Sequence, residues 1–428
     1  MKTQARKQQV QVCLGEQALA LGELAYVKEG AREYSAFAYE PAWLAAAQRF
    51  AVSPDLPLVG GHQVHRAVAP NESVFHHALA DTEPDAWGQR VIARAHAKAR
   101  STNPALAALT AFDTLAAVDD FSRVGALRLR SSDGSYLGHF NQAGPRTPPL
   151  VDLAQLLHAS RAVEAGTDTA QDLAYLRGKG TSLGGMRPKC TLLDEDGSLA
   201  LGKFPSLHDQ RPIERGEVLA MLLATRAGID AARARLVRVG DAPVAVITRF
   251  DRSAEHGRIP YLSAASMLLA RRDEDRSYTE LADAIRAQGA APSADLAQLW
   301  RRLVFNLLIS NVDDHLHNLG FLHVGWGQWR LAPSFDLNPF PDKDRESKTW
   351  LSESAGPITS LAMLMAHAAY FDLQPDQALA VLAQVHSAVG QWRQVASSAE
   401  VGLTFSEQDD FAQAFEHREM SAAKKLLG

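Results

Sequence analysis

The order of elements in the middle of the chain constrains its fold more than any other sequence feature. A glycine-rich segment, GKGTSLGGMRPK at 178–189, leads into a hairpin pattern that turns at Asp196-Gly197 and ends on Lys203. A helix pattern over about 214–227 and a second hairpin pattern follow, and after Asp251 the sequence becomes mainly helical. This order predicts an α+β fold with two lobes, of which the second is mainly helical.

The N-terminal part of the chain has residue patterns that predict both strands and helices. Apolar and polar residues alternate at Val10, Val12 and Leu14 and again over 35–39, which is typical of strands. An Ala- and Leu-rich stretch at 101–118 predicts a helix. We therefore predict a small α+β subdomain, a central region with the glycine-rich loop, and a helical region, at 1–120, 121–250 and 251–428 respectively.

Composition excludes several classes of protein. Hydrophobic residues make up 46% and charged residues 22% of the 428 residues, which is ordinary for a globular protein, and no apolar run is long enough to cross a bilayer. Cys13 and Cys190 are too few for a disulfide framework, and the first residues have no apolar signal core, so a cytoplasmic location is expected. The net charge of −5 argues against a protein that binds nucleic acid mainly by itself.

The glycine-rich loop and the residues after it have the properties of a phosphate site. Glycines at 184 and 185 let backbone N–H groups approach phosphate oxygens, because no Cβ stands in the way. Lys203 can bring a positive charge to those phosphates, and Glu217 on the following helix can hold the lysine by an ion pair. Each feature alone is weak, since a glycine pair is usually a turn and a lysine at a strand end is usually solvated.

A second group of polar residues completes a phosphoryl-transfer site. Asp313 is suited to accept the proton of an attacking hydroxyl, and Asn318 follows five residues later, the spacing of the catalytic loop in protein kinases. Asp336 comes just after a short hairpin pattern and, with Asn318, offers the oxygen ligands that Mg²⁺ prefers. The whole order predicts an ATP- and Mg²⁺-dependent kinase.

Two other functions remain open on the sequence. A metal-dependent phosphohydrolase would use the acidic and imidazole groups Asp313, Asp314, His315, His317 and Asp336, but it leaves the glycine-rich loop without a role. A catalytically silent co-repressor subunit would only bind a partner and DNA. Activity without nucleotide would favour the first alternative, and nucleotide binding without transfer would favour the second.

Five motifs resemble those of HipA-family serine/threonine kinases, the toxins of type II toxin–antitoxin modules. They are SLGGMRPK, LGKFP, VITRFDR, SNVDDHLHNLGF and APSFDLNP, and the early segment LGELAYVKEGAREYSAFAYEPAWL also resembles the N-terminal subdomain of that family. The resemblance implies a protein-kinase-like fold with an extra N-terminal subdomain. It also implies a HipB-like helix-turn-helix antitoxin as partner, operator DNA bound only through that antitoxin, and an aminoacyl-tRNA synthetase as a substrate.

The resemblance also implies roles for individual residues. Asp313 matches the catalytic aspartate, Asn318 and Asp336 the metal ligands, and Ser182 the autophosphorylated serine. The matched ATP-binding residues are Gly184, Gly185, Met186, Arg187, Pro188, Lys189, Lys203, Thr248, Arg249, Phe250, His315 and Asn318. Met186 departs from the pattern, because a small residue is usual there. Asp336 lies in Ser-Phe-Asp-Leu and not in Asp-Phe-Gly, so the regulatory movement of the eukaryotic segment is not expected.

Overall fold

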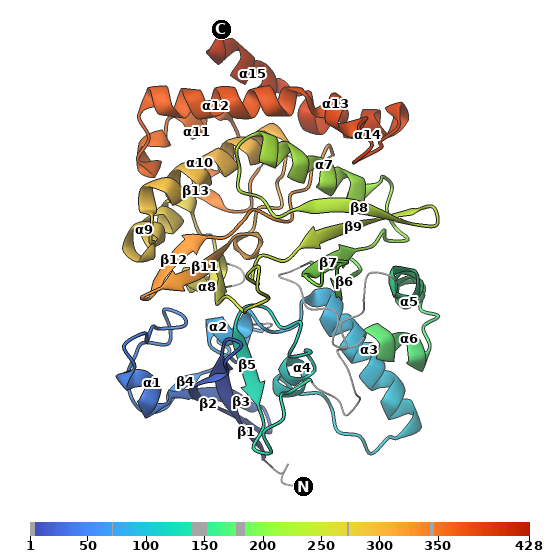
Figure 1. Cartoon of the computed structure of the whole chain (residues 1–428), viewed down its shortest axis with the longest axis vertical. Helices are drawn as coiled ribbons and strands as arrows, with labels where there is room; N and C mark the ends of the chain where they lie inside the picture. The colour runs from blue at the N-terminus through green and yellow to red at the C-terminus, as the bar shows by residue number, and fades with distance from the viewer. Residues whose placement is uncertain (1–4, 71, 139–151, 177–184, 272–273, 343–345) are drawn as a thin grey trace. The chain divides into compact units, whose positions relative to one another are not determined.

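The computed structural model divides the chain into two compact units, each with helices and strands (Figure 1). It describes residues 5–70, 72–138, 152–176, 185–271, 274–342 and 346–428. The first unit comprises residues 1–207, 251–272 and 325–327, and the second comprises 208–250, 273–324 and 328–428. The predicted α+β class is therefore confirmed, whereas the predicted division at residues 120 and 250 stays a prediction.

The first unit is built on an antiparallel sheet of five strands. Its strands are β1 (Arg6–Leu14), β2 (Leu19–Glu29), β3 (Arg32–Tyr39), β4 (Gln63–His65) and β5 (Leu127–Arg130), in the order β4-β3-β2-β1-β5. The alternation expected of a half-buried sheet is visible in β2 and β3, where Leu24, Tyr26 and Phe37 are fully buried. The ring of Tyr26 lies 6.0 Å from that of Phe75 and 5.7 Å from that of Phe112, so aromatic packing joins the sheet to the segments that cover it.

Helices and three further short strands complete the described part of the first unit. They are α1 (Pro41–Ala45), α2 (His77–Ala80), α3 (Ala86–Thr102), α4 (Ala111–Ala116), α5 (Leu153–Ala165), α6 (Ala170–Leu176), α8 (Ala264–Met267), the hairpin strands β6 (Lys189–Leu193) and β7 (Leu199–Lys203), and β10 (Tyr261–Ser263). The single helix predicted over 101–118 is wrong. Pro104 disfavours helical geometry at Asn103, where α3 ends, and Thr110 begins α4 afresh with a capping box.

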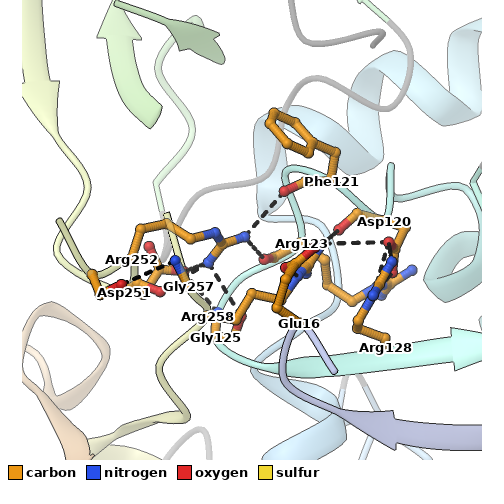
Figure 2. A network of polar contacts seen from close by, with 11 residues as sticks. Glu16, Asp120, Phe121, Arg123, Gly125, Arg128, Asp251, Arg252, Gly257 and Arg258 are labelled. Atoms are coloured by element: carbon orange, nitrogen blue, oxygen red, sulfur yellow. Dashed lines mark hydrogen bonds and ion pairs between the residues drawn. The ribbon is translucent and has the colours of Figure 1, made fainter. Parts of the chain in front are cut away.

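Hydrogen bonds and ion pairs of buried arginines hold the start of residues 251–272 to the rest of the first unit (Figure 2). Asp251 accepts a hydrogen bond from the backbone N–H of Gly125 at 2.7 Å and forms an ion pair with Arg252 at 2.8 Å. The Arg252 guanidinium also donates to the carbonyl oxygens of Phe121 and Arg123. These bonds explain why residues 251–272 belong to the first unit although they follow a strand of the second.

Asp120 is the acidic centre of the same network. Its carboxylate accepts three hydrogen bonds from Arg128, the shortest at 2.6 Å, and lies 3.3 Å from the guanidinium of Arg258. The three side chains are almost completely removed from solvent, at 2%, 11% and 3% exposure. The buried Asp120 carboxylate is therefore paired with two guanidinium groups, and Arg258 has a second, more exposed partner in Glu16 at 3.3 Å.

Asp120→Asn is expected to lower the free energy of unfolding by about 3–5 kcal/mol, because it leaves buried positive charge without its counter-ion. Urea denaturation of the whole chain measures the loss. Asp409→Asn is the matched control, since Asp409 pairs with Arg393 while its side chain is 75% exposed, and such pairs contribute about 0–1 kcal/mol. Equal effects of the two substitutions would contradict the role assigned to Asp120.

The second unit begins with a helix and a hairpin and continues as a helical bundle. Its first elements are α7 (Ile213–Arg226), β8 (Ala234–Val239), β9 (Ala242–Thr248), α9 (Tyr278–Gln288) and α10 (Pro292–Leu308). Short elements follow: η2 (Leu316–Asn318), β11 (Gly320–Gly325), β12 (Gln328–Leu331), β13 (Trp350–Ser352) and β14 (Gly356–Pro357). The chain continues through α11 (Leu361–Met365), η3 (Ala368–Phe371), α12 (Pro375–Gly390), α13 (Trp392–Ala396), α14 (Phe405–Phe415) and α15 (Arg418–Leu427).

Helix α10 forms the core of the second unit. Apolar side chains recur along it at the spacing of a helix face that is buried, among them Leu296, Leu299, Trp300 and Leu303. The ring of Trp300 lies 5.5 Å from that of Phe371. Because α10 packs against α9, α12 and η3, its C-terminal end is held firmly, and the loop that carries Asp313 starts from that end.

Candidate active site

The loop after α10 is shaped by backbone conformation and by hydrogen bonds of its own. Ser310 takes a left-handed φ of +53°, which turns the chain out of the helix, and its carbonyl accepts a hydrogen bond from the backbone of Phe340 at 3.2 Å. The Asn311 amide donates to Asn306 on α10 at 3.1 Å. The loop therefore presents the Asp-Asp-His sequence that begins at Asp313 from a fixed base.

Asn318 ends the short helix η2 with its amide group already oriented. Its Nδ2 donates to the backbone oxygen of Asp313 at 2.9 Å. Its Oδ1 is buried and has no hydrogen-bond partner among the residues that the structure describes. A buried amide oxygen without a donor is costly unless something outside the protein satisfies it, so this atom fits a bound cation.

Asp336 lies in the loop after β12 and takes a left-handed φ of +54°. Such a conformation is uncommon outside glycine, although aspartate tolerates it better than most residues. Asn338 donates to the Asp336 carboxylate at 3.0 Å, and the ring of Phe335 packs 5.4 Å from that of Phe250. The strained backbone and these contacts fix the direction of a carboxylate that can serve as a hard oxygen ligand.

One pocket of the second unit brings several predicted site residues together. Asp314, His315, Asn318 and Asp336 all line it, although 22 positions separate the first from the last. Its other lining residues are Tyr278, Leu299, Arg302, Leu303, Asn306, Asn311, Leu319, Ser334, Phe335 and Leu337. The proposed metal ligands Asn318 and Asp336 therefore line one space, to which α10 contributes both apolar and polar side chains.

Asp314 connects the loop to two other segments of the second unit through hydrogen bonds. It accepts hydrogen bonds from the Tyr278 hydroxyl at 2.6 Å and from the Lys348 backbone N–H at 2.7 Å. Burial raises its pKa to about 6, and burial also raises the pKa of Tyr278. Sequence patterns point to Asp314 only as a ligand in the hydrolase alternative, because its two partners lie about 35 positions away in the chain.

His315 and Asp313 differ in their exposure to solvent, since the imidazole is largely buried and the carboxylate is partly exposed. Burial lowers the pKa of His315, so its imidazole is neutral at pH 7, and its Nδ1 has no hydrogen-bond partner within the described part of the chain. The Asp313 carboxylate is about one-third exposed and forms an ion pair with the ammonium group of Lys348. Asp313 is thus the accessible carboxylate of the loop, as a group that accepts a proton from a substrate must be.

The phosphate-loop residues belong to the first unit. Lys189 on β6 is the direct cross-strand neighbour of Lys203 on β7, and both side chains are buried. The Lys189 ammonium lies 3.4 Å from the carboxylate of Asp85, the residue that caps α3 by accepting a hydrogen bond from Gly88. The hairpin therefore places two lysines together at its end, where the glycine-rich segment enters β6.

Gly185 is the described glycine of the predicted phosphate loop. Its φ is +102°, a conformation that side-chain-bearing residues rarely adopt, and a Cβ there would lie 2.5 Å from the Lys189 ammonium. Its carbonyl accepts a hydrogen bond from the Trp87 backbone at 3.4 Å. The absence of a side chain at this position is therefore required for the lysine to stand where it does.

Gly185→Ala is expected to reduce the rise in Tm that Mg²⁺–ATP produces, because the new methyl group displaces Lys189. Differential scanning fluorimetry, with each variant compared to its own ligand-free Tm, measures the change. Gly197→Ala is the control: this turn glycine also has a positive φ, +78°, but no atom within 4 Å of a Cβ. Equal ATP-induced shifts in both variants would show that Gly185 has no part in binding.

The other predicted residues are distributed over both units. Met186 is exposed, and Pro188 accepts a hydrogen bond from the backbone of Phe204 at 2.9 Å. Thr248 ends β9 and donates its backbone N–H to the Arg233 carbonyl, so the predicted adenine hinge of Thr248, Arg249 and Phe250 begins on the last residue of a strand. Glu217 is buried on α7 of the second unit, whereas Lys203 is in the first, so their pairing stays a prediction. Ser182 and Gly184 lie outside the described residues.

The described residues contain neither a cluster of metal-binding side chains nor a membrane-spanning helix. No group of three or more His, Cys, Asp or Glu side chains is arranged to hold a metal ion in the part of the chain that the structure describes. In the same part, no helix combines the length and the apolar character that a membrane span requires.

Two domain models of one protein family match the chain. Residues 11–129 match the HipA N-terminal domain, and residues 181–392 match the HipA-like C-terminal domain. Together the two matches include most of the N-terminal sheet, the lysine hairpin, the Asp313 loop and Asp336. The chain therefore belongs to the HipA family.

Individual relatives agree with this assignment. A Sinorhizobium fredii protein named "Putative kinase Y4mE" is 26% identical over 235 residues, which are 50% of this chain and 54% of the relative, so the match spans about half of each protein. HipA of Shewanella oneidensis MR-1, solved with HipB and its operator DNA, has a TM-score of 0.63 and 16% identity over 97% of both chains. At that identity the likeness concerns the fold alone.

Proposed function

We propose that this protein is a Mg²⁺- and ATP-dependent serine/threonine protein kinase and the toxin of a HipBA-like module. The observation that carries the proposal is the arrangement around the pocket of the second unit. Two oxygen ligands suited to Mg²⁺, Asn318 Oδ1 and the Asp336 carboxylate, line one space, and the accessible carboxylate of Asp313 belongs to the same loop as Asn318.

The residues of this chain suit an in-line phosphoryl transfer. The acceptor hydroxyl oxygen forms a bond to the γ-phosphorus while the bond from that phosphorus to the bridging oxygen breaks, and its electron pair leaves with ADP. Asp313 takes the hydroxyl proton and later releases it to water. Lys189 and Lys203 would supply positive charge to the phosphates. Asn318 and Asp336 would hold a Mg²⁺ ion, whose chemistry is to offset negative charge on the phosphate oxygens.

Family membership supports the remaining parts of the proposal. A HipB-like helix-turn-helix antitoxin is the proposed partner, operator DNA is bound only through it, and an aminoacyl-tRNA synthetase is the proposed class of substrate. The net charge of −5 suits a chain that does not grip DNA by itself. Autophosphorylation at Ser182 would place a charge of about −1.5 to −2 beside the phosphate loop and so limit nucleotide binding.

The proposed activity is tested by finding the acceptor. The purified chain is incubated with γ-labelled Mg²⁺–ATP and a bacterial lysate, and labelled proteins are identified by mass spectrometry. Phosphoserine or phosphothreonine in a translation protein is the expected product. Label that appears only as inorganic phosphate would instead favour the phosphohydrolase.

A further inference from the structure

The segment that precedes β13 is fastened to the Asp313 loop at several points. The backbone N–H of Lys348 donates to the Asp314 carboxylate at 2.7 Å, and the Thr349 hydroxyl donates to the Asp314 backbone oxygen at 2.7 Å. The Ser347 hydroxyl donates to the Thr349 carbonyl at 2.6 Å. Because Asp314 and Thr349 are buried, these bonds hold the backbone of residue 348 beside the loop.

The side chain of Lys348 extends from this fixed backbone to the neighbouring carboxylate. Its ammonium forms an ion pair with Asp313 Oδ1, so one residue binds Asp314 through its main chain and Asp313 through its side chain. The main chain of Asp313 is held as well, since its carbonyl accepts the hydrogen bond from Asn318 at 2.9 Å. The main chain and the carboxylate of Asp313 are therefore each fixed by a different neighbour.

We propose that Lys348 is a positioning residue for the phosphoryl transfer: it orients the Asp313 carboxylate toward the acceptor hydroxyl. This inference rests on the proposed kinase function and assigns to that reaction a residue that no motif marks. A carboxylate on a loop can rotate about two side-chain bonds, and only one orientation presents an oxygen to the incoming proton. An ammonium group fixed at one oxygen restricts that rotation and leaves the other oxygen available.

A plain surface ion pair is the competing interpretation. The Lys348 side chain is 55% exposed, and exposed pairs usually contribute little to stability. The two interpretations differ in what they change. A surface pair affects neither turnover nor binding, whereas a positioning residue affects turnover and leaves both the fold and nucleotide binding in place.

The test compares Lys348→Met with Lys348→Arg, using the whole chain and a peptide or protein acceptor of the wild type. Methionine keeps an unbranched stem without charge, and arginine restores the cation. We expect kcat of the methionine variant to fall about 10- to 100-fold with KM for ATP within about threefold of wild type, and we expect arginine to recover a large part of the loss. Lys28→Met, which breaks the Lys28–Glu33 pair of the first unit at 2.8 Å, is the control.

The outcomes separate this inference from the function on which it rests. Absence of transfer by the wild type overturns the kinase proposal and the inference with it. Transfer by the wild type with unchanged or increased kcat in Lys348→Met overturns the inference alone. A loss that is equal in both variants and accompanied by a fall in Tm beyond about 5 °C would show a folding role and overturn it too.

Discussion

Asp313→Asn is expected to reduce phosphoryl transfer by at least about a hundredfold, and up to about ten-thousandfold, because a carboxamide keeps the shape of the side chain but cannot accept the hydroxyl proton. The structure gives a reason to expect that the fold survives. The loop is held by the Asp313 carbonyl and by Asp314, neither of which the substitution removes. Transfer rate with saturating Mg²⁺–ATP is the measurement, and the ATP-induced rise in Tm should remain near that of the wild type.

The control for this substitution is Asp283→Asn, a change of the same type at a side chain of α9 that is 78% exposed. It should leave the rate unchanged. A rate for Asp313→Asn within about threefold of wild type would remove the catalytic role from this residue, since loss of a general base costs far more.

Lys203→Met should remove most of the stabilisation that Mg²⁺–ATP gives to the protein. A ligand at a hundred times its Kd stabilises the folded state by about 2.7 kcal/mol, and a tenfold weaker Kd already reduces this by about 1.3 kcal/mol. Lys203 stands beside Lys189 at the end of the hairpin, with its side chain buried, so loss of its charge also removes a cation that solvent screens poorly.

The measurement is the Tm with and without Mg²⁺–ATP, each variant serving as its own reference. Lys28→Met again serves as the control, because it changes a lysine in the N-terminal sheet. An undiminished shift in Lys203→Met would show that this lysine does not bind the nucleotide.

Local patterns predicted the hairpins and helices well, because turns and caps depend on residues that are close in sequence. The turns at Gly197 and Gly240 take positive φ values of +78° and +60°, and α7 spans Ile213–Arg226 against a predicted 214–227. The helix predicted over 101–118 failed for a local reason too, since Pro104 interrupts it. The return of residues 251–272 to the first unit has no local signal, because Asp251 and Arg252 act on residues about 125 positions away.

The same distinction applies to the candidate site. The spacing of Asp313 and Asn318 and the choice of Asp336 follow from short motifs, and the structure brings Asn318 and Asp336 to one pocket. Tyr278 and Lys348 contact the loop from segments about 35 positions away, with residue types that are ordinary in any protein. Only the folded chain shows that these two residues support the loop.

The central claim is that this chain moves the γ-phosphoryl group of ATP to a protein. It is tested most directly by comparing γ-labelled with α-labelled Mg²⁺–ATP in the presence of the acceptor or of the chain alone, with acid-stable label on protein as the measurement. We expect label on serine or threonine from the γ-position only, and we expect that label to be lost on removal of Mg²⁺ and in Asp313→Asn. Binding of ATP with no label on any protein, or label released entirely as inorganic phosphate, would contradict it.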